Sequence, residues 1–469
     1  MCGITGTIFT KKLNHISRVD PYSIYKDLMD SGDVLTKQEI GKLYKFSIAY
    51  KSDINFIKYF ESSDERETVD RIVKILKKKT KSLLKTDLEN SKLYSIDSWI
   101  NDRDKILDVI WFLDDELVNR YSFVKKFIKK DEQFSRNSLQ FFKTLNSIIN
   151  SINLLEMRGR DSLGLCFQFV LKQNKANLEW YKTSEIEKQY LSEIVDNKIV
   201  IHAIYRTFNR IGSLGENSGI ILNEFRGDKT IINLINSGSF ESISIIAHTR
   251  WASVGSVNQQ NIHPLVNLKR STNQIPTILS FVNGDIYNYK EIYQKMVWHD
   301  KVNYNINEEI DSIALSYLFS EKHTFSTLKQ IREKLSTIVG SITGNLLSTE
   351  NPSKVLIFKK GSQGMFLGKN TDRFYFASDA YGLIEDCNKV YNLDNNCFGL
   401  FDAEENESDL KIYGIDSSLY KKIKNKDYIE VTISSRDVSK KQFKHYLLKE
   451  IYESRDIVES TLRRYIKIQ

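Results

Sequence analysis

The character of the chain changes twice along its length, and these changes limit the folds open to it. After a short strand-like start at residues 4–9, residues 11–156 are rich in lysine, poor in glycine and helical in their periodicity. From residue 158 onward, short apolar runs alternate with turns marked by glycine. Any fold for this chain therefore has to join a helical segment to a sheet-rich one.

Two stretches of the helical segment are amphipathic. Between residues 139 and 155, apolar side chains recur at spacings of three and four, which places them on one face of a helix. Residues 104–128 follow a similar pattern, although Asp114 interrupts the apolar face. We interpret residues 11–155 as a helical insertion, because they are far longer than a normal connection.

The sheet-rich segment contains several recognisable strands and helices. Strands are expected at residues 164–172, 242–249, 277–283, 355–360 and 374–378. Helical turns are expected after Asn288, Asp311 and Thr324. Because strands and helices mix without strict alternation, the pattern favours an α+β layered fold. The last stretch, residues 443–468, is typical of an exposed helix or a linker.

Cys2 lies directly behind the initiator methionine. Removal of Met1 would leave a residue that carries both a thiol and a free α-amino group. An α-amino group titrates at about 7.7 to 8.0, so it can serve as the base that a thiol nucleophile needs at neutral pH. An inert thiol or a lipidation site are the alternatives. Gly3 and Gly6 favour the catalytic interpretation, since glycines let a substrate approach the backbone closely.

A second candidate segment, residues 247–253, lies where an apolar strand ends. An arginine in that position, Arg250, can bind a carboxylate through two parallel hydrogen bonds, and a surface salt bridge is the alternative. Trp251 beside it could close over a substrate or simply pack against its neighbours. The segment is therefore a candidate for binding an acidic group.

Two further segments carry polar groups that fit acyl transfer. In the first, an apolar strand runs into a sharp turn at Asn283–Gly284. Asn-Gly is the commonest hairpin turn pair, yet the amide and the glycine N–H also supply two donors that can meet at one oxyanion. In the second, the carboxylates of residues 307–312 open a helix. Such acids usually complement the helix dipole, and one of them could instead hold an ammonium group.

Taken together, these segments resemble the class II glutamine amidotransferases, and most of all the glutaminase half of glutamine:fructose-6-phosphate aminotransferase (isomerizing). The motifs that carry the resemblance are residues 1–4, 158–164, 248–252, His263-Pro264, Asn283-Gly284, 377–379 and 445–451. Trp251 is typical of this branch of the family. The resemblance covers the first ten residues and most of residues 156–469.

The resemblance implies a fold and a division into domains. It implies a four-layer α/β/β/α sandwich of the N-terminal-nucleophile hydrolase type, formed by residues 1–10 and 156–440. The helical insertion, residues 11–155, is absent from ordinary members of the family. Residues 441–469 look like the linker into a sugar-isomerase domain, which this chain would lack.

The resemblance also implies a mechanism in which a thiol attacks the side-chain amide of L-glutamine and water then releases glutamate from the thioester. The implied catalytic residues are Cys2, Asn283 and Gly284, and the implied substrate-binding residues are Arg250, Trp251, Ser253, Glu309 and Asp311. Arg250 would bind the α-carboxylate, and Glu309 or Asp311 the α-ammonium group. The two histidines of the motifs, His248 and His263, are expected to be structural.

The chain departs from the family pattern at several positions. Glu309 stands where the family has Asp, and Asp311 two residues on could take its place. Val254 replaces a usual His, and Arg160 replaces a usual Tyr. Because of the departure at Glu309, either Glu309 or Asp311 could bind the ammonium group.

Three functions therefore fit the sequence. The first is a glutaminase that supplies ammonia for glucosamine 6-phosphate synthesis from fructose 6-phosphate, with a sugar-phosphate isomerase domain or subunit as partner. The second is an amidotransferase for another acceptor, as in asparagine synthetase, and the third is a non-catalytic glutamine-binding or regulatory module. The chain could be a fragment, a split subunit or a stand-alone glutaminase.

Composition limits the partners and the cellular compartment that we expect for the protein. The net charge of +8 is a mild excess on 469 residues and does not indicate nucleic acid as a partner. The four cysteines lack metal-site spacing and disulfide density, so we expect a reducing cytoplasm and neither metal nor cofactor. No apolar run approaches the ~18 residues of a membrane span, and no signal peptide is recognisable, so no membrane association is expected.

Overall fold

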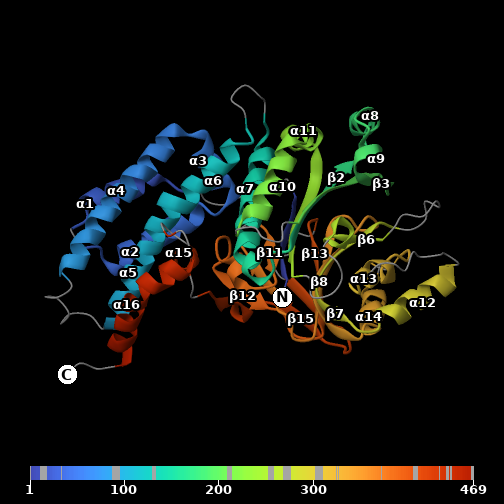
Figure 1. Ribbon diagram of the computed structural model, residues 1–469. Coiled ribbons are helices and arrows are strands. Elements are labelled where there is room, and N and C mark those ends of the chain that lie inside the picture. The colour runs from blue at the N-terminus through green and yellow to red at the C-terminus, as the bar shows by residue number, and fades with distance from the viewer. Residues whose placement is uncertain are drawn as a thin grey trace. The chain divides into compact units, whose positions relative to one another are not determined.

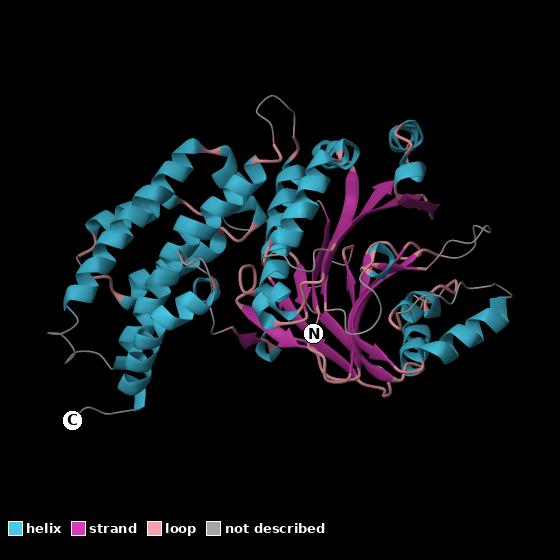
Figure 2. Cartoon of the chain, viewed as in Figure 1, coloured by secondary structure: helices cyan, strands magenta, loops and turns pink. Residues whose placement is uncertain are grey.

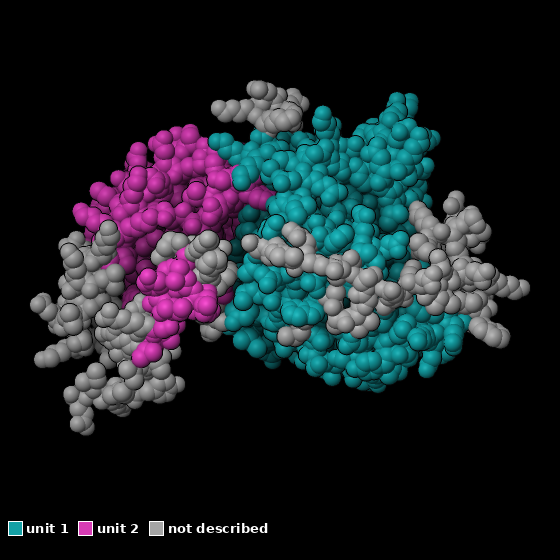
Figure 3. Space-filling model, viewed as in Figure 1, with its two compact units in different colours: residues 1–13, 124–431 teal, residues 14–123, 432–469 magenta. Residues whose placement is uncertain are grey.

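The computed structural model of the protein describes most of residues 2–465. Within that range it leaves out residues 11–17, 33, 87–95, 129–133, 209–213, 252–257, 268–275, 301–309, 324, 326, 371, 405–409, 432–433, 440–442 and 444–445. The chain divides into two compact units, coloured teal and magenta in Figure 3. Unit 1 comprises residues 1–13 and 124–431, and unit 2 comprises residues 14–123 and 432–469.

Unit 1 is built on two β-sheets (Figure 2). The first is nine-stranded, in the order β16 (Ile429–Glu430), β12 (Lys389–Asn392), β10 (Phe366–Lys369), β11 (Phe374–Ala377), β1 (Gly3–Thr10), β5 (Phe240–Arg250), β2 (Ser162–Lys172), β4 (Lys198–Thr207) and β3 (Leu191–Val195). Its neighbouring strands are antiparallel. The strand that follows Cys2, β1, therefore lies inside the sheet, between β11 and β5.

The second sheet has seven strands, which also pair in antiparallel fashion. Their order is β15 (Tyr420–Ile423), β14 (Leu410–Gly414), β13 (Cys397–Asp402), β9 (Lys354–Lys360), β8 (Gly340–Ser348), β7 (Ile278–Ile286) and β6 (Leu265–Val266). Side chains of both sheets share one buried apolar cluster, to which β1 contributes Ile4 and β7 contributes Phe281. The two sheets therefore face each other across a common core.

Helices cover both sheets (Figure 1). Those of unit 1 are α7 (Arg136–Leu155), α8 (Lys175–Thr183), α9 (Ile186–Gln189), α10 (Glu216–Gly227), α11 (Lys229–Ser237), α12 (Tyr289–Asp300), α13 (Ile313–Leu318) and α14 (Leu328–Ser336). Helix α7 contacts β1 and β5, and α10 contacts β2 and β4. On the second sheet, α13 contacts β6 and β7, and a second core cluster joins α12, α13 and α14 to that sheet.

The mixture of helices and strands predicted from the sequence is confirmed. Each of the five expected strands is present, as β2, β5, β7, β9 and β11, and helices α12, α13 and α14 follow the three positions where helical turns were expected. The central strands β2 and β5 are buried along almost their whole length. Burial on both faces explains why their sequences read as apolar runs rather than as a strict alternation.

The expected sharp turn at Asn283–Gly284 is wrong. Strand β7 runs through both residues as far as Ile286, and Gly284 is paired with Ile342 of β8. Gly284 has a φ of 105°, and a Cβ atom added to it would lie 1.9 Å from the carbonyl oxygen of Ser341. Glycine is therefore required at this position for two reasons. A side chain would clash with β8, and only glycine adopts this φ easily.

Unit 2 is helical in the part of it that is described. Its helices are α1 (Pro21–Asp30), α2 (Lys37–Ala49), α3 (Asp53–Glu61), α4 (Ser63–Thr86), α5 (Ile96–Trp111), a π-helical turn (Phe112–Glu116), α6 (Leu117–Lys125), α15 (Ser435–Val438) and α16 (Tyr446–Tyr465). The π-helical turn coincides with Asp114, the residue that interrupts the apolar pattern, and Lys77 of α4 binds its carboxylate at 2.6 Å. No described helix is both long and apolar enough to cross a membrane.

The C-terminal segment belongs to the same unit as these helices. Arg436 of α15 binds Asp108 of α5, with 3.0 Å between Nε and Oδ1. Helix α7, in contrast, is grouped with unit 1 although the sequence suggested it as the end of the insertion. The domain boundaries drawn from the sequence, residues 11–155 for an insertion and 441–469 for a linker, stay predictions.

Candidate active site

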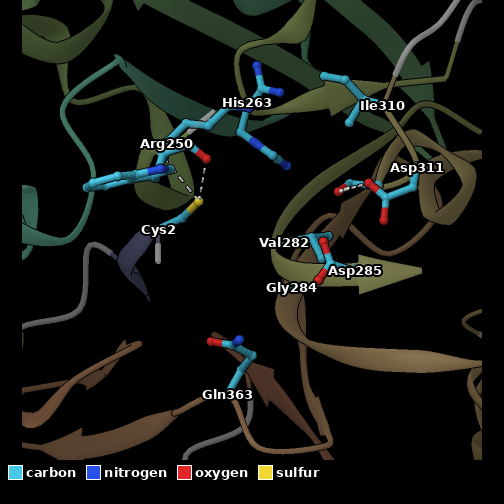
Figure 4. Close-up of a pocket in the computed structure, with 11 residues that line it drawn as sticks. Cys2, Arg250, His263, Val282, Gly284, Asp285, Ile310, Asp311 and Gln363 are labelled. Carbon is cyan, nitrogen blue, oxygen red and sulfur yellow. Dashed lines mark hydrogen bonds between the residues drawn. The ribbon is translucent and has the colours of Figure 1, made fainter. Parts of the chain in front are cut away.

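A cavity of about 180 Å³ lies in unit 1 (Figure 4). Its lining residues are Cys2, Arg250, Trp251, His263, Val282, Gly284, Asp285, Ile310, Asp311, Ser312 and Gln363. The cavity is smaller than the ~300 Å³ at which pockets for drug-sized ligands begin, so its size suits a small metabolite. It brings a thiol, a guanidinium group and carboxylates together in one cavity.

Most of the residues singled out in the sequence meet at this cavity. Five of them line it directly, namely Cys2, Arg250, Trp251, Gly284 and Asp311. Asn283 contacts the backbone of Cys2. The other two, Ser253 and Glu309, lie outside the described residues.

Cys2 is fixed by the strand that it precedes. The N–H of Gly3 donates to Thr249 Oγ1 at 3.1 Å, and the N–H of Ile4 donates to Ser378 Oγ at 3.0 Å. A Cβ atom added to Gly3 would lie 2.7 Å from Cβ of Leu155, so only glycine lets the strand pass this close to α7. These contacts place the thiol at the start of the interior strand β1, next to the end of β5.

The thiol of Cys2 accepts a hydrogen bond from the backbone N–H of Trp251, with 3.3 Å between the nitrogen and Sγ. Burial raises the pKa of this thiol, although the Trp251 N–H and the charge of Arg250 act in the opposite direction. Because burial is the largest of these effects, the sulfur is held as a thiol at neutral pH. A base is therefore needed to turn it into a nucleophile.

Arg250 is the last residue of β5, and its neighbours fix its backbone. The N–H of Asp161 donates to the Arg250 carbonyl oxygen at 3.0 Å. A Cβ atom on Gly159 would lie 2.7 Å from the Arg250 carbonyl carbon, so glycine lets this segment run against the strand end. The Arg250 side chain is only 5% exposed, and burial lowers its pKa, while the charges of Asp161 and Asp311 raise it.

The amide of Asn283 is oriented by contacts on both of its sides. Its Nδ2 donates to the carbonyl oxygen of Cys2 at 3.0 Å. Its Oδ1 lies 3.1 Å from Nε2 of His248, which is also 3.1 Å from the carbonyl oxygen of Val282. Since both neighbours of this Nε2 are oxygens that accept, we assign the ring proton to Nε2. The amide nitrogen carries two hydrogens, so one remains beyond its bond to Cys2.

The rings of His248 and His263 form a buried contact, with centroids 3.9 Å apart and planes tilted by 32°. Burial lowers the pKa of His248 to about 4. Burial, followed by the neighbouring His248, lowers the pKa of His263 well below its usual value. Both rings are therefore uncharged at neutral pH. The hydrogen bonds of His248 to Val282 and Asn283 are consistent with the structural role expected for this residue.

The low pKa of His248 predicts a loss of stability in acid. An unfolded histidine has a pKa of about 6.5, so between that value and about 4 the unfolded chain binds a proton that the folded chain does not. Stability therefore falls as the pH falls, by about 2 kcal/mol from His248 between about pH 7 and about pH 5. Urea unfolding of the full chain at the two pH values measures this loss.

The matched variant for this prediction is His248→Gln, which keeps an N–H donor but no group that titrates in this range. The variant is expected to lose less stability than the wild type on the same acidification, because the His248 contribution is gone. An equal acid loss in both proteins would contradict the assignment of a depressed pKa to His248.

Asp311 faces the cavity just before α13. Its carboxylate accepts hydrogen bonds from the backbone N–H of Ile286 and from the Ser312 hydroxyl, the latter at 3.3 Å. Burial raises its pKa, and the nearby charge of Asp285 adds to this effect. A cationic group bound next to Asp311 would offset both effects and favour the carboxylate.

Three polar lining residues, Gln363, Asp285 and Ser312, were not singled out from the sequence. Asp285 lies in β7 next to Gly284, so its place could have been inferred from that motif. Gln363 follows β9 in a turn between Gly361 and Gly364, and such glycines indicate a loop without saying what it faces. Among the described residues, no group of three or more His, Cys, Asp or Glu side chains is placed to hold a metal ion.

The chain is similar in sequence to enzymes named glutamine–fructose-6-phosphate aminotransferase (isomerizing). The relative from Chlorobaculum tepidum is 26% identical over 232 residues, covering 48% of this chain and 34% of the relative. The one from Clostridium tetani is 27% identical over 223 residues, and the one from Acinetobacter baylyi 26% identical over 266. This similarity confirms the relationship to glutamine amidotransferases that the motifs indicated.

The chain spans only about a third of the length of these curated relatives. No protein-family model matches it. Among solved structures, the allosteric regulatory enzyme of purine biosynthesis has a TM-score of 0.39 at 16% identity, over 58% of this chain and 46% of the other. The glutamine phosphoribosylpyrophosphate amidotransferase of B. subtilis has a TM-score of 0.38 at 14% identity, over the same shares.

Proposed function

We propose that this chain is the glutamine-hydrolysing unit of a class II glutamine amidotransferase, which converts L-glutamine to glutamate and ammonia. The observation that carries the proposal is a single cavity that joins the thiol of Cys2, the guanidinium of Arg250 and the carboxylate of Asp311. A guanidinium and a carboxylate in one small cavity match the two opposite charges of an amino acid. The thiol in the same cavity can then reach the side chain of that amino acid.

Binding would be governed by the charges of the cavity. Arg250 would hold the α-carboxylate through two parallel hydrogen bonds. Asp311 is our candidate for the α-ammonium group, and Glu309 remains the alternative. Trp251 is 57% exposed beside the cavity, so it is free to cover the bound substrate, and Ser253 would belong to the same loop.

Hydrolysis would begin with removal of Met1, which frees the α-amino group of Cys2. The amino group takes the thiol proton, the sulfur attacks the amide carbon, and the same proton passes to the departing nitrogen. Ammonia leaves, and water then cleaves the thioester to glutamate. The raised pKa of the Cys2 thiol supports this scheme, because a buried thiol requires an adjacent base.

The oxyanion of the tetrahedral intermediate would be stabilised by Asn283 and the N–H of Gly284. The second hydrogen on Asn283 Nδ2 is available for this purpose, and His248 fixes the amide so that Nδ2 faces Cys2. Donors held in place before the reaction stabilise the developing charge without reorganising during it. The orientation of the Asn283 amide toward Cys2 thus supports the proposed role of Asn283 as an oxyanion donor.

The proposed fold type, ammonia acceptor, partner and cellular compartment follow mainly from the resemblance to class II glutamine amidotransferases. We assign unit 1 to the four-layer N-terminal-nucleophile fold, because two facing sheets share a core and each carries helices. The names of the relatives favour fructose 6-phosphate as the acceptor of the ammonia, with a sugar-phosphate isomerase domain or subunit as the partner. The four free thiols suit the cytoplasm as the site of action.

The proposal is tested by the requirement for a free amino terminus. The purified chain, with removal of Met1 checked by mass spectrometry, is expected to release equal amounts of glutamate and ammonia from L-glutamine. A version with a tag that prevents removal of Met1 is expected to lose this activity, since the base is then an amide. Equal glutaminase activity in both versions, or none in either, would refute the proposed mechanism.

A further inference from the structure

We propose that Gln363 contacts the amide nitrogen of the bound glutamine and makes the site selective for amides. This inference rests on the proposed function and extends it to a residue that the motifs did not indicate. Gln363 lines the same cavity as Cys2 and Gly284. Figure 4 shows its side chain across the cavity from Arg250, with Cys2 between the two.

The turn that carries Gln363 is fixed to the second sheet. The N–H of Gly361 donates to Asn395 Oδ1 at 2.6 Å, and the N–H of Ser362 donates to Ser341 Oγ at 3.1 Å. Ser341 is the residue of β8 whose carbonyl oxygen lies against Gly284. One end of the turn is therefore attached to the strand pair that presents the proposed oxyanion donor.

The other end of the turn is fixed to the first sheet. A Cβ atom added to Gly364 would lie 2.6 Å from the carbonyl oxygen of Ser378, so the turn lies directly on this residue. Ser378 in turn exchanges hydrogen bonds with Ile4, two residues after Cys2. The turn thus connects the strands of the nucleophile and of the oxyanion donor, which holds Gln363 at a defined place between them.

The direction of the substrate amide follows from the other contacts. With the α-carboxylate at Arg250, the substrate chain approaches Cys2 from the side of the cavity that carries Arg250. The amide oxygen points toward Asn283 and Gly284. An amide carbon has three substituents in one plane, so its nitrogen takes the remaining direction. Gln363 is a polar side chain of the lining that lies across Cys2 from Arg250.

A carboxamide suits contact with a departing amine. Its oxygen accepts a hydrogen bond from the amide N–H in the substrate and in the tetrahedral intermediate. When the carbon–nitrogen bond breaks, the electron pair remains on nitrogen, which takes the proton carried by the Cys2 amino group and leaves as ammonia. The bond to Gln363 strengthens as positive charge develops on this nitrogen, because hydrogen bonds to charged groups are stronger.

The test compares two substrates in the full chain with its processed amino terminus. L-glutamine loses ammonia, whereas L-glutamate γ-methyl ester loses methanol, and its leaving group has no N–H to donate to Gln363. In Gln363→Leu, which keeps the bulk but removes the acceptor, kcat/KM for glutamine is expected to fall about tenfold to a hundredfold. The same parameter for the ester is expected to change less than about threefold.

The control is Ser362→Ala, which changes the adjacent residue of the same turn. It is expected to leave the ratio of the two kcat/KM values as in the wild type, because its side chain does not line the cavity. An equal loss for both substrates in Gln363→Leu, or no loss for either, would overturn the inference while leaving the proposed function intact. A wild-type chain that hydrolyses neither substrate would overturn the proposed function itself, and the inference with it.

Discussion

Replacement of Cys2 by alanine is expected to lower kcat/KM for glutamine by more than about 10³-fold, because the thioester then cannot form. The cavity offers no substitute, since Cys2 is the only thiol among its lining residues. The fold is expected to persist, because the Cys2 side chain makes its described hydrogen bonds only to the backbone of Trp251. Release of glutamate by the two purified proteins measures the loss, and circular dichroism checks the fold.

The matched control for this variant is Cys397→Ala. Cys397 lies in β13 of the second sheet and does not line the cavity, although it is as buried as a core residue. This variant is expected to keep glutaminase activity within about twofold and to lose some stability, since it leaves a small space in the core. Appreciable activity in Cys2→Ala, above about 1% of the wild type, would show that another group is the nucleophile.

Replacement of Asn283 by alanine is expected to lower kcat by about 10²- to 10³-fold with a smaller change in KM. In the proposed mechanism the amide donates to an oxygen that becomes negative only in the transition state, so its loss is expected to affect the chemical step more than binding. Asn283→Asp should be at least as inactive, because it has the same shape but brings a negative charge to the oxyanion. Steady-state kinetics of the three proteins measure these effects.

A separate variant distinguishes an oxyanion role from a purely structural one. Asn283 also holds the carbonyl oxygen of Cys2, so its removal could displace the nucleophile. The rate of alkylation of Cys2 by iodoacetamide reports on the sulfur without requiring an oxyanion. If this rate falls in Asn283→Ala by the same factor as kcat, the residue positions Cys2 and does not stabilise the oxyanion.

Most of the candidate site could be predicted from the sequence because its residues belong to short, local patterns. Arg250 stands where an apolar strand ends, and β5 does end there. Cys2 precedes a strand-like run, and β1 begins directly after it. Binding residues are often found where a strand passes into a loop. Predicting the ends of these strands therefore also predicted the positions of these residues.

The behaviour of Asn283–Gly284 could not be predicted in this way. As a dipeptide it favours a hairpin turn, but β8 pairs with β7 through and beyond it, and the strand continues. Tertiary pairing overrode the local preference because it satisfies the backbone hydrogen bonds of the whole strand. The functional role suggested for the pair did not depend on the turn, so it was unaffected by this error.

The sequence by itself determined several strands and helices of unit 1 and most of the residues proposed to carry chemistry, because periodicity and strand ends are local properties of the chain. Only the tertiary structure decided which of these residues meet in one cavity, and that Gln363, more than 350 positions from Cys2, joins them. It also decided that Gly159, Gly164 and Gly284 lie where backbones touch. Contacts between distant segments depend on how the two sheets face each other, and no local pattern encodes that arrangement.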